Sequence, residues 1–337
     1  GAGVIQASGS SSDNVTLTAG LRQGLSAEEI LALVLAVEPS PRLLQTGIVT
    51  LYPGAPVTYT GRGVGRAKHG VVGEVGELAY AIQGNVLAGD AVVTAAEQAL
   101  LSTNGDTGQR LMAAMVAARQ FGGDGRCSCD FTLADSCGSP PPSFEKSAHV
   151  GFVVVARIGD AVPPCLVGND CAEGGFHLRL NIRGADASED DPDPVDQLVV
   201  RYAEWRAARA GRPDAILSRV DAVDALPADG LTKRTVTVQL VDIEGVPLTH
   251  GGARVTVAPA AGAHAALGPV TDLGDGRYRF TLTATTSVGL DRLVIRAEDD
   301  LVKATLYPTL EVRSEPPTAL HAGRDALSAA EGGEVPF

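Results

Sequence analysis

The chain has 337 residues, of which 45% are apolar, and its 27 basic and 40 acidic residues give a formal charge of −13. This length and apolar content are enough for two or three domains with cores of their own. The negative charge argues against nucleic acid or an anionic membrane as partners, and no apolar run approaches the length of a membrane span.

The first 30 residues predict a strand followed by a polar segment and a helix start. Residues 3–7 have the pattern of a strand, and the serine-rich residues 8–14 suit a turn or a lid. Ser26 and Glu29 fit a capping box, in which each side chain meets the backbone of the other residue. We therefore expect a helix to begin at this point and to run until the prolines near residue 40.

Residues 45–76 predict a hairpin and then a loop. Residues 45–51 and 56–59 have the pattern of two strands joined by a turn. Residues 61–76 contain six glycines, so we expect a mobile surface loop there. His69 lies in this loop and is either a catalytic base or a solvated side chain.

A buried strand at residues 78–83 ends in a polar, glycine-bounded segment before a helix that opens near Asp90. Gln83 and Asn85 lie at this strand end, where side chains often serve chemistry. The alternative is a tight turn in which both amides only satisfy loop backbone. Spacing alone leaves both interpretations open.

Two amphipathic helices, around residues 92–100 and 111–118, have the pattern of a helix hairpin. The second is followed by Gly-Gly-Asp-Gly-Arg at residues 122–126, where glycines suit a left-handed C-cap and Asp124 and Arg126 project from a tight turn. This segment lacks the P-loop lysine and follows a helix instead of preceding one. We therefore predict no phosphate cradle and no cofactor.

The five cysteines lie within 45 residues of one another. Cys165 and Cys171 flank a loop rich in Pro, Gly and Asn, and we predict a disulfide between them. Cys137 is able to close on either Cys127 or Cys129, which leaves one thiol unpaired. Disulfides indicate an oxidising compartment, so we expect an extracellular or periplasmic protein.

Zinc is the competing interpretation of the first three cysteines, with His149 as a fourth ligand. Their spacing matches none of the common zinc patterns, so we predict no metal site. The acidic run at residues 189–194 suggests calcium, but a helix start with Asp193 as N-cap and Pro194 in the first turn explains it better.

Strands at residues 150–156 and 176–182, followed by the helix after Asp193, complete an order typical of a layered α+β domain. From residue 232 the pattern changes to short strands separated by turns, which predicts an all-β sandwich. Residues 272–278, Asp-Leu-Gly-Asp-Gly-Arg-Tyr, look like a turn of bacterial immunoglobulin-like modules.

Several segments resemble a bacterial and archaeal family, domain of unknown function 1028, which has an N-terminal-nucleophile (Ntn) hydrolase-like fold. They are residues 3–7, 24–29, 45–49, 60–61, 81–89 and 122–126. Their Q-G-N-x-L-A-G and G-G-D-x-R patterns are specific. The family's opening strand pair has no counterpart in this sequence, and the cysteine-bearing residues 127–142 form an insertion.

The resemblance implies a four-layer αββα sandwich over residues 1–212. We place a linker at residues 213–231, an immunoglobulin-like β-sandwich at 232–314 and a disordered tail at 315–337.

In Ntn hydrolases the first residue of the mature chain is the nucleophile, which Gly1 cannot be, so a nucleophile is expected upstream of this sequence. Gln83 and Asn85 would then stabilise an oxyanion, and Asp124 and Arg126 would orient a substrate or a loop; purely structural roles for all four are the alternative.

Our leading hypothesis is a secreted Ntn-hydrolase-like protein that hydrolyses amide bonds. The competing hypothesis is a non-catalytic extracellular binding or scaffold protein with an immunoglobulin-like adhesion module. Both imply a small-molecule or peptide ligand and leave homo-oligomerisation open.

Overall fold

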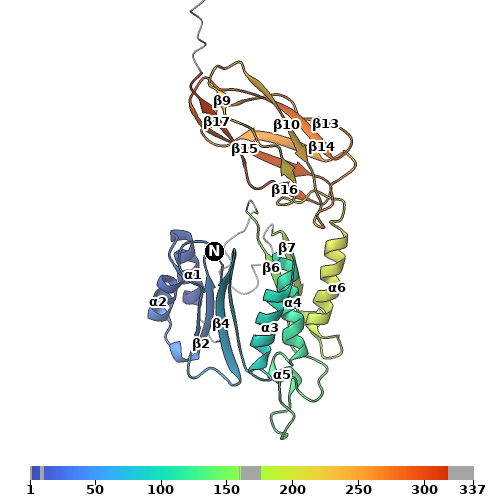
Figure 1. Cartoon of the computed structure of the whole chain (residues 1–337). Helices are drawn as coiled ribbons and strands as arrows, with labels where there is room; N and C mark the ends of the chain where they lie inside the picture. The colour runs from blue at the N-terminus through green and yellow to red at the C-terminus, as the bar shows by residue number, and fades with distance from the viewer. Residues whose placement is uncertain (1, 8–10, 159, 161–175, 318–337) are drawn as a thin grey trace, which may run out of the picture. The chain divides into compact units, whose positions relative to one another are not determined.

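The computed structural model describes residues 2–7, 11–158, 160 and 176–317 (Figure 1). The chain divides into two compact units, Gly1–Glu204 and Trp205–Phe337. The first unit mixes helices with short sheets. The second begins with the last residues of helix α6 (Pro194–Ala207), and strands follow. The protein is therefore an α+β chain with an N-terminal helix–sheet region and a C-terminal all-β region.

The N-terminal unit opens with a three-stranded antiparallel sheet, in the order β1–β2–β3, that is packed against two helices. The elements are β1 (Ala2–Ala7), α1 (Ser11–Gln23), α2 (Ala27–Val37), a 3-10 turn (Pro41–Leu43), β2 (Leu44–Val49) and β3 (Val57–Thr60). Leu17, Ile30, Leu44 and Ile48 are buried between the helices and this sheet. The pairing of β2 with β3 confirms the predicted hairpin.

Local signals determine where the two helices begin and end. The capping box is confirmed, because the Ser26 side chain accepts from the Glu29 N–H and the Glu29 carboxylate accepts from the Ser26 N–H. The turn or lid expected over residues 8–14 is wrong in its second half, since α1 already begins at Ser11. Asp13 in the first turn of α1 is favoured by the positive end of the helix dipole.

A second hairpin follows, made of β4 (Lys68–Val75) and β5 (Leu78–Asn85). The mobile loop expected over residues 61–76 is therefore wrong over residues 68–75, which is half of its length. A Cβ at Gly73 would lie 2.3 Å from the Tyr80 hydroxyl, so this glycine makes room for a neighbour within the hairpin. His69 lies in β4, opposite Gly84 of β5.

The rest of the N-terminal unit contributes helices and one more strand pair. The elements are α3 (Ala91–Ser102), α4 (Thr107–Gln120), α5 (Gly125–Ser128), β6 (Gly151–Val155), β7 (Leu178–Ile182), a 3-10 turn (Gly184–Ala187) and α6 (Pro194–Ala207). α3 and α4 pack against each other as predicted. Strands are present as predicted at β6 and β7, and the two pair antiparallel. Asp193 accepts the Val195 N–H at 2.7 Å, which confirms it as the cap of α6.

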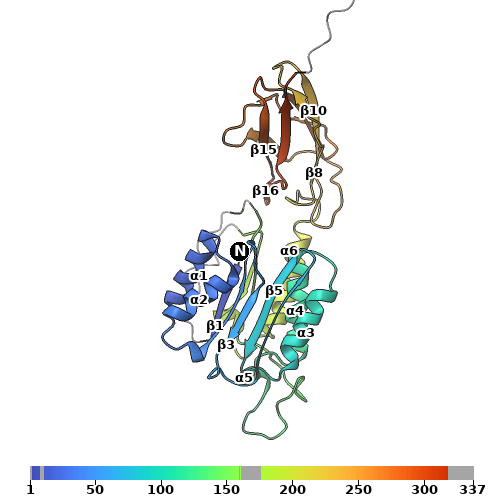
Figure 2. The ribbon, with the colours of Figure 1, turned by 60° about the vertical axis from the view of Figure 1, so that its left-hand side comes forward.

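Layers are visible within the N-terminal unit. Helices α1 and α2 cover one side of the β1–β2–β3 sheet, and β2 packs against β5 of the second hairpin (Figure 2). Helix α3 contacts β4 and β5. Tyr80 of β5 is buried in one cluster with Ala96 and Leu100 of α3 and Ala114 of α4. Polar side chains of β2 and β5 meet at the contact between these two strands.

The C-terminal unit holds two sheets. They are ordered β12–β14–β10–β8, with β13 beside β14, and β11–β15–β17–β9, with β16 beside β15. The strands are β8 (Arg219–Val220), β9 (Leu226–Pro227), β10 (Lys233–Gln239), β11 (Arg254–Pro259), β12 (Ala266–Leu267), β13 (Thr271–Asp272), β14 (Arg277–Thr283), β15 (Gly289–Glu298), β16 (Lys303–Thr305) and β17 (Leu310–Glu315). Burial alternates along β14 and β17, and one core that includes Phe280 and Ile295 lies within the unit.

Residues 213–231, expected as a linker, differ from that expectation. β8 pairs with β10 and β9 pairs in parallel with β17, so this segment adds an edge strand to each sheet. These strands are two residues long, too short to show a periodic pattern in the sequence. Of the tail expected after residue 314, residues 318–337 lie outside the described part of the chain.

Candidate functional site

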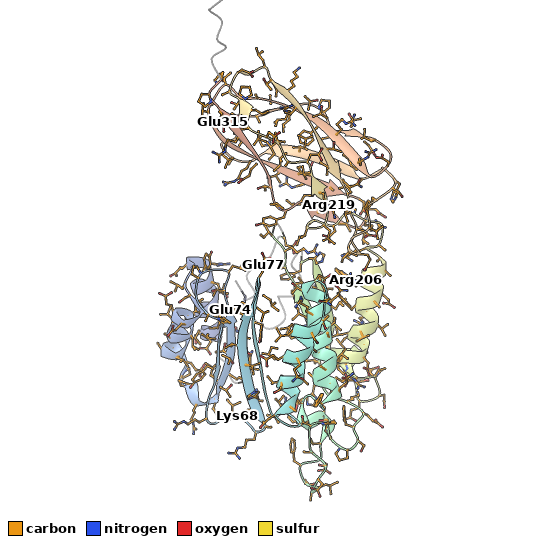
Figure 3. The ribbon with its side chains drawn as sticks, viewed as in Figure 1. Lys68, Glu74, Glu77, Arg206, Arg219 and Glu315 are labelled. Atoms are coloured by element: carbon orange, nitrogen blue, oxygen red, sulfur yellow. The ribbon has the colours of Figure 1, made fainter. Side chains whose placement is uncertain are left out.

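A pocket of about 360 Å³ lies in the N-terminal unit at the end of β5. Gln83, Asn85, Asp124 and Arg126, the four site residues predicted from the sequence, all line it. Its apolar wall consists of Ile82, Leu87, Val92, Val93, Ala96 and Ala118. Lys68, which pairs with Asn85, marks this end of the hairpin, and Glu74 and Glu77 mark the other end (Figure 3).

Backbone hydrogen bonds join the two sequence motifs that meet at the pocket. The Ala88 N–H donates to the Gly123 carbonyl at 3.0 Å, and the Gly125 N–H donates to the Val86 carbonyl at 2.7 Å. Val86 has a φ of 53°, which is rare for a β-branched residue and is held here by these neighbours. The Q-G-N-x-L-A-G and G-G-D-x-R segments therefore form one structural element.

Gln83 is the residue of the pocket lining whose side chain has a buried oxygen, Oε1, without a hydrogen-bond partner among the described residues. The carboxamide packs against β2, where a Cβ at Gly47 would lie 2.2 Å from Oε1. Leaving a buried polar atom unpaired costs about 1–3 kcal/mol, so this oxygen favours a ligand that donates a hydrogen bond.

Asn85 is held by a residue that the sequence did not single out. Its Nδ2 donates to Oε1 of Gln45 at 2.9 Å, and Nε2 of Gln45 donates to the Gly84 carbonyl and to the Thr60 hydroxyl, each at 3.0 Å. Gln45 is fully buried. A buried glutamine at the start of an otherwise apolar strand was the available signal.

Asp124 caps the short helix α5 and binds Arg126. One carboxylate oxygen accepts the Arg126 N–H at 2.9 Å, and the guanidinium donates to both carboxylate oxygens. These hydrogen bonds raise the pKa of Arg126. The Asp124 side chain is 21% exposed and that of Arg126 is 59% exposed, so the guanidinium is free to move.

Among the residues described as lining the pocket, Ser147 carries the one hydroxyl. It is buried, and its Oγ and N–H both donate to Oδ2 of Asp193, at 2.8 and 2.5 Å. Asp193 also lies 3.6 Å from Arg119. Because the Ser147 hydroxyl already donates to this buried carboxylate, it serves as an anchor for the segment that precedes β6.

The described cysteines are free thiols. Burial and then a hydrogen bond with Cys137 raise the pKa of Cys129, so the structure brings together one of the two pairs expected. Burial raises the pKa of Cys127 to about 11, which keeps this thiol protonated at neutral pH. The predicted disulfide between Cys165 and Cys171 lies outside the described residues.

The fold and the site together define an α+β domain with a polar pocket, followed by an immunoglobulin-like sandwich. Residues 1–133 match the "Family of unknown function (DUF1028)", which confirms the resemblance found in the sequence. Residues 215–305 match "Invasin, domain 3". No curated protein sequence matches the chain.

Solved structures similar to parts of the chain include adhesins and a protein of the first family. Yersinia pseudotuberculosis adhesin InvE is 25% identical over 30% of this chain and 26% of its own, with a TM-score of 0.25. SPO2555 from Silicibacter pomeroyi, a DUF1028 protein, is 22% identical over 36% of this chain and 54% of its own, with a TM-score of 0.31. The Escherichia coli adhesin FdeC is 20% identical over 32% of each chain, with a TM-score of 0.26.

The chain thus spans about half the length of SPO2555 and a smaller share of the two adhesins. Among the described residues, every helix falls short of the length and hydrophobicity that a membrane span requires.

Proposed function

We propose that the N-terminal unit binds a small polar ligand in the pocket at the end of β5. The observation that carries this proposal is the buried Oε1 of Gln83, which has no partner among the described residues and belongs to a residue that lines the pocket together with Asn85, Asp124 and Arg126. Ligand pockets typically combine an apolar wall with a few convergent polar groups. A ligand that donates a hydrogen bond to Gln83 would remove the cost of the unpaired oxygen.

The lining narrows the chemistry of the ligand. Gln83 accepts a hydrogen bond, so the ligand carries an amide N–H, an ammonium or a hydroxyl group. Arg126 offers a cation at the same pocket, and the walls from α3 and β5 take a short apolar group. An N-acylated amino acid, an amino acid amide or a dipeptide meets all three conditions.

We also propose how the layers of the N-terminal unit are arranged. We infer a four-layer αββα sandwich of the Ntn-hydrolase type, in which α1 and α2 form one outer layer and α3 and α4 the other. The packing of α2 on β2, of β2 on β5 and of α3 on β5 supports it. In this arrangement the pocket lies at the end of a central strand.

The C-terminal unit supports a proposal about where the protein is located. We propose that the chain works outside the cell or at its surface, because residues 215–305 match a domain of invasin. The second unit would then present or anchor the pocket domain. This is tested by adding a protease to intact cells that produce the protein and measuring whether the chain is cleaved. We expect cleavage, and a chain that stays fully protected would contradict the proposal.

Amide-bond hydrolysis is the second candidate function. The gathering of the Gln83 and Asn85 carboxamides in one pocket favours it, since such groups donate to the oxyanion of acyl-transfer reactions. Ser147 is engaged with Asp193, so the described lining of the pocket offers no hydroxyl that is free to act as the nucleophile. Labelling of the natural mature protein with an amine-sensitive electrophile, followed by N-terminal sequencing, decides this point.

The binding proposal is tested with a panel of N-acetyl amino acids, amino acid amides and dipeptides. Thermal-shift screening of the full chain selects members, and calorimetry measures their affinity. We expect Gln83→Ala to weaken binding at least about tenfold, a loss of about 1.4 kcal/mol. Gln23→Ala is the matched control, because Gln23 is an exposed glutamine at the end of α1 that does not line the pocket.

Failure of every panel member to bind would contradict the proposal. Binding that Gln83→Ala leaves unchanged would also contradict it, since the affinity would then not depend on the buried carboxamide.

A further inference from the structure

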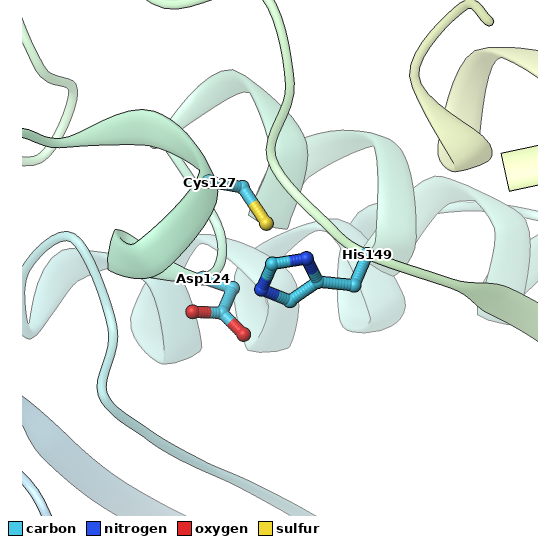
Figure 4. A group of neighbouring side chains, drawn as sticks. All are labelled: Asp124, Cys127 and His149. Atoms are coloured by element: carbon cyan, nitrogen blue, oxygen red, sulfur yellow. The ribbon is translucent and has the colours of Figure 1, made fainter. Parts of the chain in front are cut away.

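We propose that Asp124, Cys127 and His149 form a binding site for a divalent metal ion of the zinc class. A carboxylate oxygen, the Cys127 sulfur and an imidazole nitrogen all lie within 4.8 Å of one another. Figure 4 shows the His149 ring reaching toward both the sulfur and the carboxylate. Among the described residues, no other set of three such side chains brings its ligand atoms this close.

Two of the ligands come from one helical turn. Asp124 is the N-cap of α5, and the Cys127 N–H donates to the Asp124 carbonyl at 3.0 Å. Residues three apart on a helix lie on the same face, which directs both side chains to one side of α5. The geometry of this pair is therefore set by local structure.

The third ligand is brought in by a long-range backbone contact. The Asp124 N–H donates to the Ser147 carbonyl at 2.8 Å, which fixes the segment that precedes β6 beside α5. Ser147 is in turn held by the buried Asp193. His149 follows two residues later and is exposed, so its imidazole has room to rotate onto an ion.

The donor set selects the metal. Zinc binds Cys, His and Asp at about 2.0–2.3 Å, which places the donors of a tetrahedral site about 3.3–3.6 Å apart. Side-chain rotations that move the ligand atoms by about 1 Å would bring the three groups to that spacing. Zinc displaces the Cys127 proton to the solvent when the metal–sulfur bond forms. The resulting thiolate ligand disfavours Mg²⁺ and Ca²⁺, which prefer oxygen donors.

Arg126 competes with the metal for Asp124. The guanidinium donates to both carboxylate oxygens in this structure, and a cation bound there would displace it. Because the Arg126 side chain is 59% exposed, it is able to swing away without disrupting a core. We therefore expect Arg126→Ala to raise the affinity for zinc.

The neighbouring cysteines provide internal controls. Cys129 and Cys137 hydrogen-bond to each other and are not in the set that contains Cys127. His69 is a histidine of β4 outside the set. Substitutions at Cys137 and His69 thus change the same residue types without removing a proposed ligand.

The test uses the full chain, reduced with a phosphine and stripped with a chelator. Cobalt(II) is added as a spectroscopic probe, and zinc affinity is measured against a chromophoric chelator. We expect one ion per chain and a thiolate-to-cobalt charge-transfer band that Cys127→Ser abolishes. Cys127→Ser and His149→Ala should each weaken zinc binding at least about tenfold, since loss of outer-sphere partners alone costs that much.

Cys137→Ser and His69→Ala should leave both the band and the affinity unchanged. A band that persists in Cys127→Ser, or an affinity that His149→Ala does not alter, would overturn the proposed ligand set. Absence of any band in the parent chain would overturn the site itself.

Alkylation of the parent chain gives a result that does not depend on whether a variant folds. Zinc should slow alkylation of Cys127, measured by mass spectrometry, and leave the rate at Cys137 unchanged. Equal protection of both thiols, or of neither, would contradict the proposal. All of these measurements are independent of whether the adjoining pocket binds an organic ligand.

Discussion

Gln45 is expected to stabilise the N-terminal unit more than any single exposed polar residue. Gln45→Met keeps the length and most of the volume of the side chain and removes its hydrogen bonds to Thr60, Gly84 and Asn85. Each bond contributes about 1 kcal/mol, and a buried partner left unpaired adds about 1–3 kcal/mol. We therefore expect the free energy of unfolding to fall by about 2–4 kcal/mol.

Thr60→Val is the matched control, since it removes one of the three bonds and keeps the side-chain shape. Its expected cost is about 1 kcal/mol. The assay is urea unfolding followed by the far-ultraviolet helix signal. Among the described residues no helix continues beyond Ala207, so this signal reports on the N-terminal unit. A Gln45→Met chain within about 0.5 kcal/mol of the parent, or a Thr60→Val chain that loses as much as Gln45→Met, would refute the reasoning.

Two further substitutions test the capping box and the pocket. Hydrogen bonds from the Ser26 backbone N–H and then from its hydroxyl lower the pKa of Glu29, so the ionised Glu29 stabilises α2 above its ordinary pKa. This stabilisation is lost as the pH falls through the lowered value. Ser26→Ala keeps the backbone N–H and removes the hydroxyl, so it should reduce this acid-dependent loss, and an unchanged stability–pH curve in urea melts would contradict it. Gly47→Ala would place a Cβ 2.2 Å from Oε1 of Gln83, a flexible side-chain end, so ligand affinity should fall at least about tenfold while the helix-monitored unfolding midpoint changes little; unchanged calorimetric affinity would contradict it.

The elements that the sequence predicted well are those with local signals. The Ser26 capping box, the two helices on either side of residue 104 and the cap of α6 at Asp193 are all specified by residues within a few positions of one another. The strands of the C-terminal unit likewise show period-two burial, as along β17. Such signals survive because backbone capping and one buried face act within a single element.

The loop predicted over residues 61–76 was wrong because glycine occurs both in loops and in strands where a neighbouring group approaches the backbone. In a loop it supplies turns, but Gly70 and Gly73 lie within β4, where the side chains of Thr58 and Tyr80 approach the backbone. Only the partner strands reveal which case applies. Gln45 was missed for a similar reason, because its hydrogen-bond partner Asn85 lies 40 residues away in the chain.

The site was predicted as separate pieces. Gln83 with Asn85 and Asp124 with Arg126 were identified in two motifs, but their spacing gives no reason for them to share a pocket. The bonds between residues 86–88 and 123–125 provide that reason. The zinc hypothesis was set aside because cysteine spacing was compared with known patterns, whereas the set in the structure combines a single cysteine with residues from two segments.

Asp124 belongs to both the pocket and the proposed metal set, so the two sites should be coupled. A metal that takes the Asp124 carboxylate releases the Arg126 guanidinium, and a free guanidinium binds a ligand carboxylate more strongly than one already paired. Zinc should therefore tighten the binding of an N-acetyl amino acid from the panel. Linkage requires that this ligand tighten zinc binding by the same factor. Calorimetric titrations in both orders measure the two factors, and Arg126→Ala should abolish the coupling even though it strengthens zinc binding itself. Absence of coupling in the parent chain, or coupling that survives in Arg126→Ala, would show that Arg126 does not link the sites.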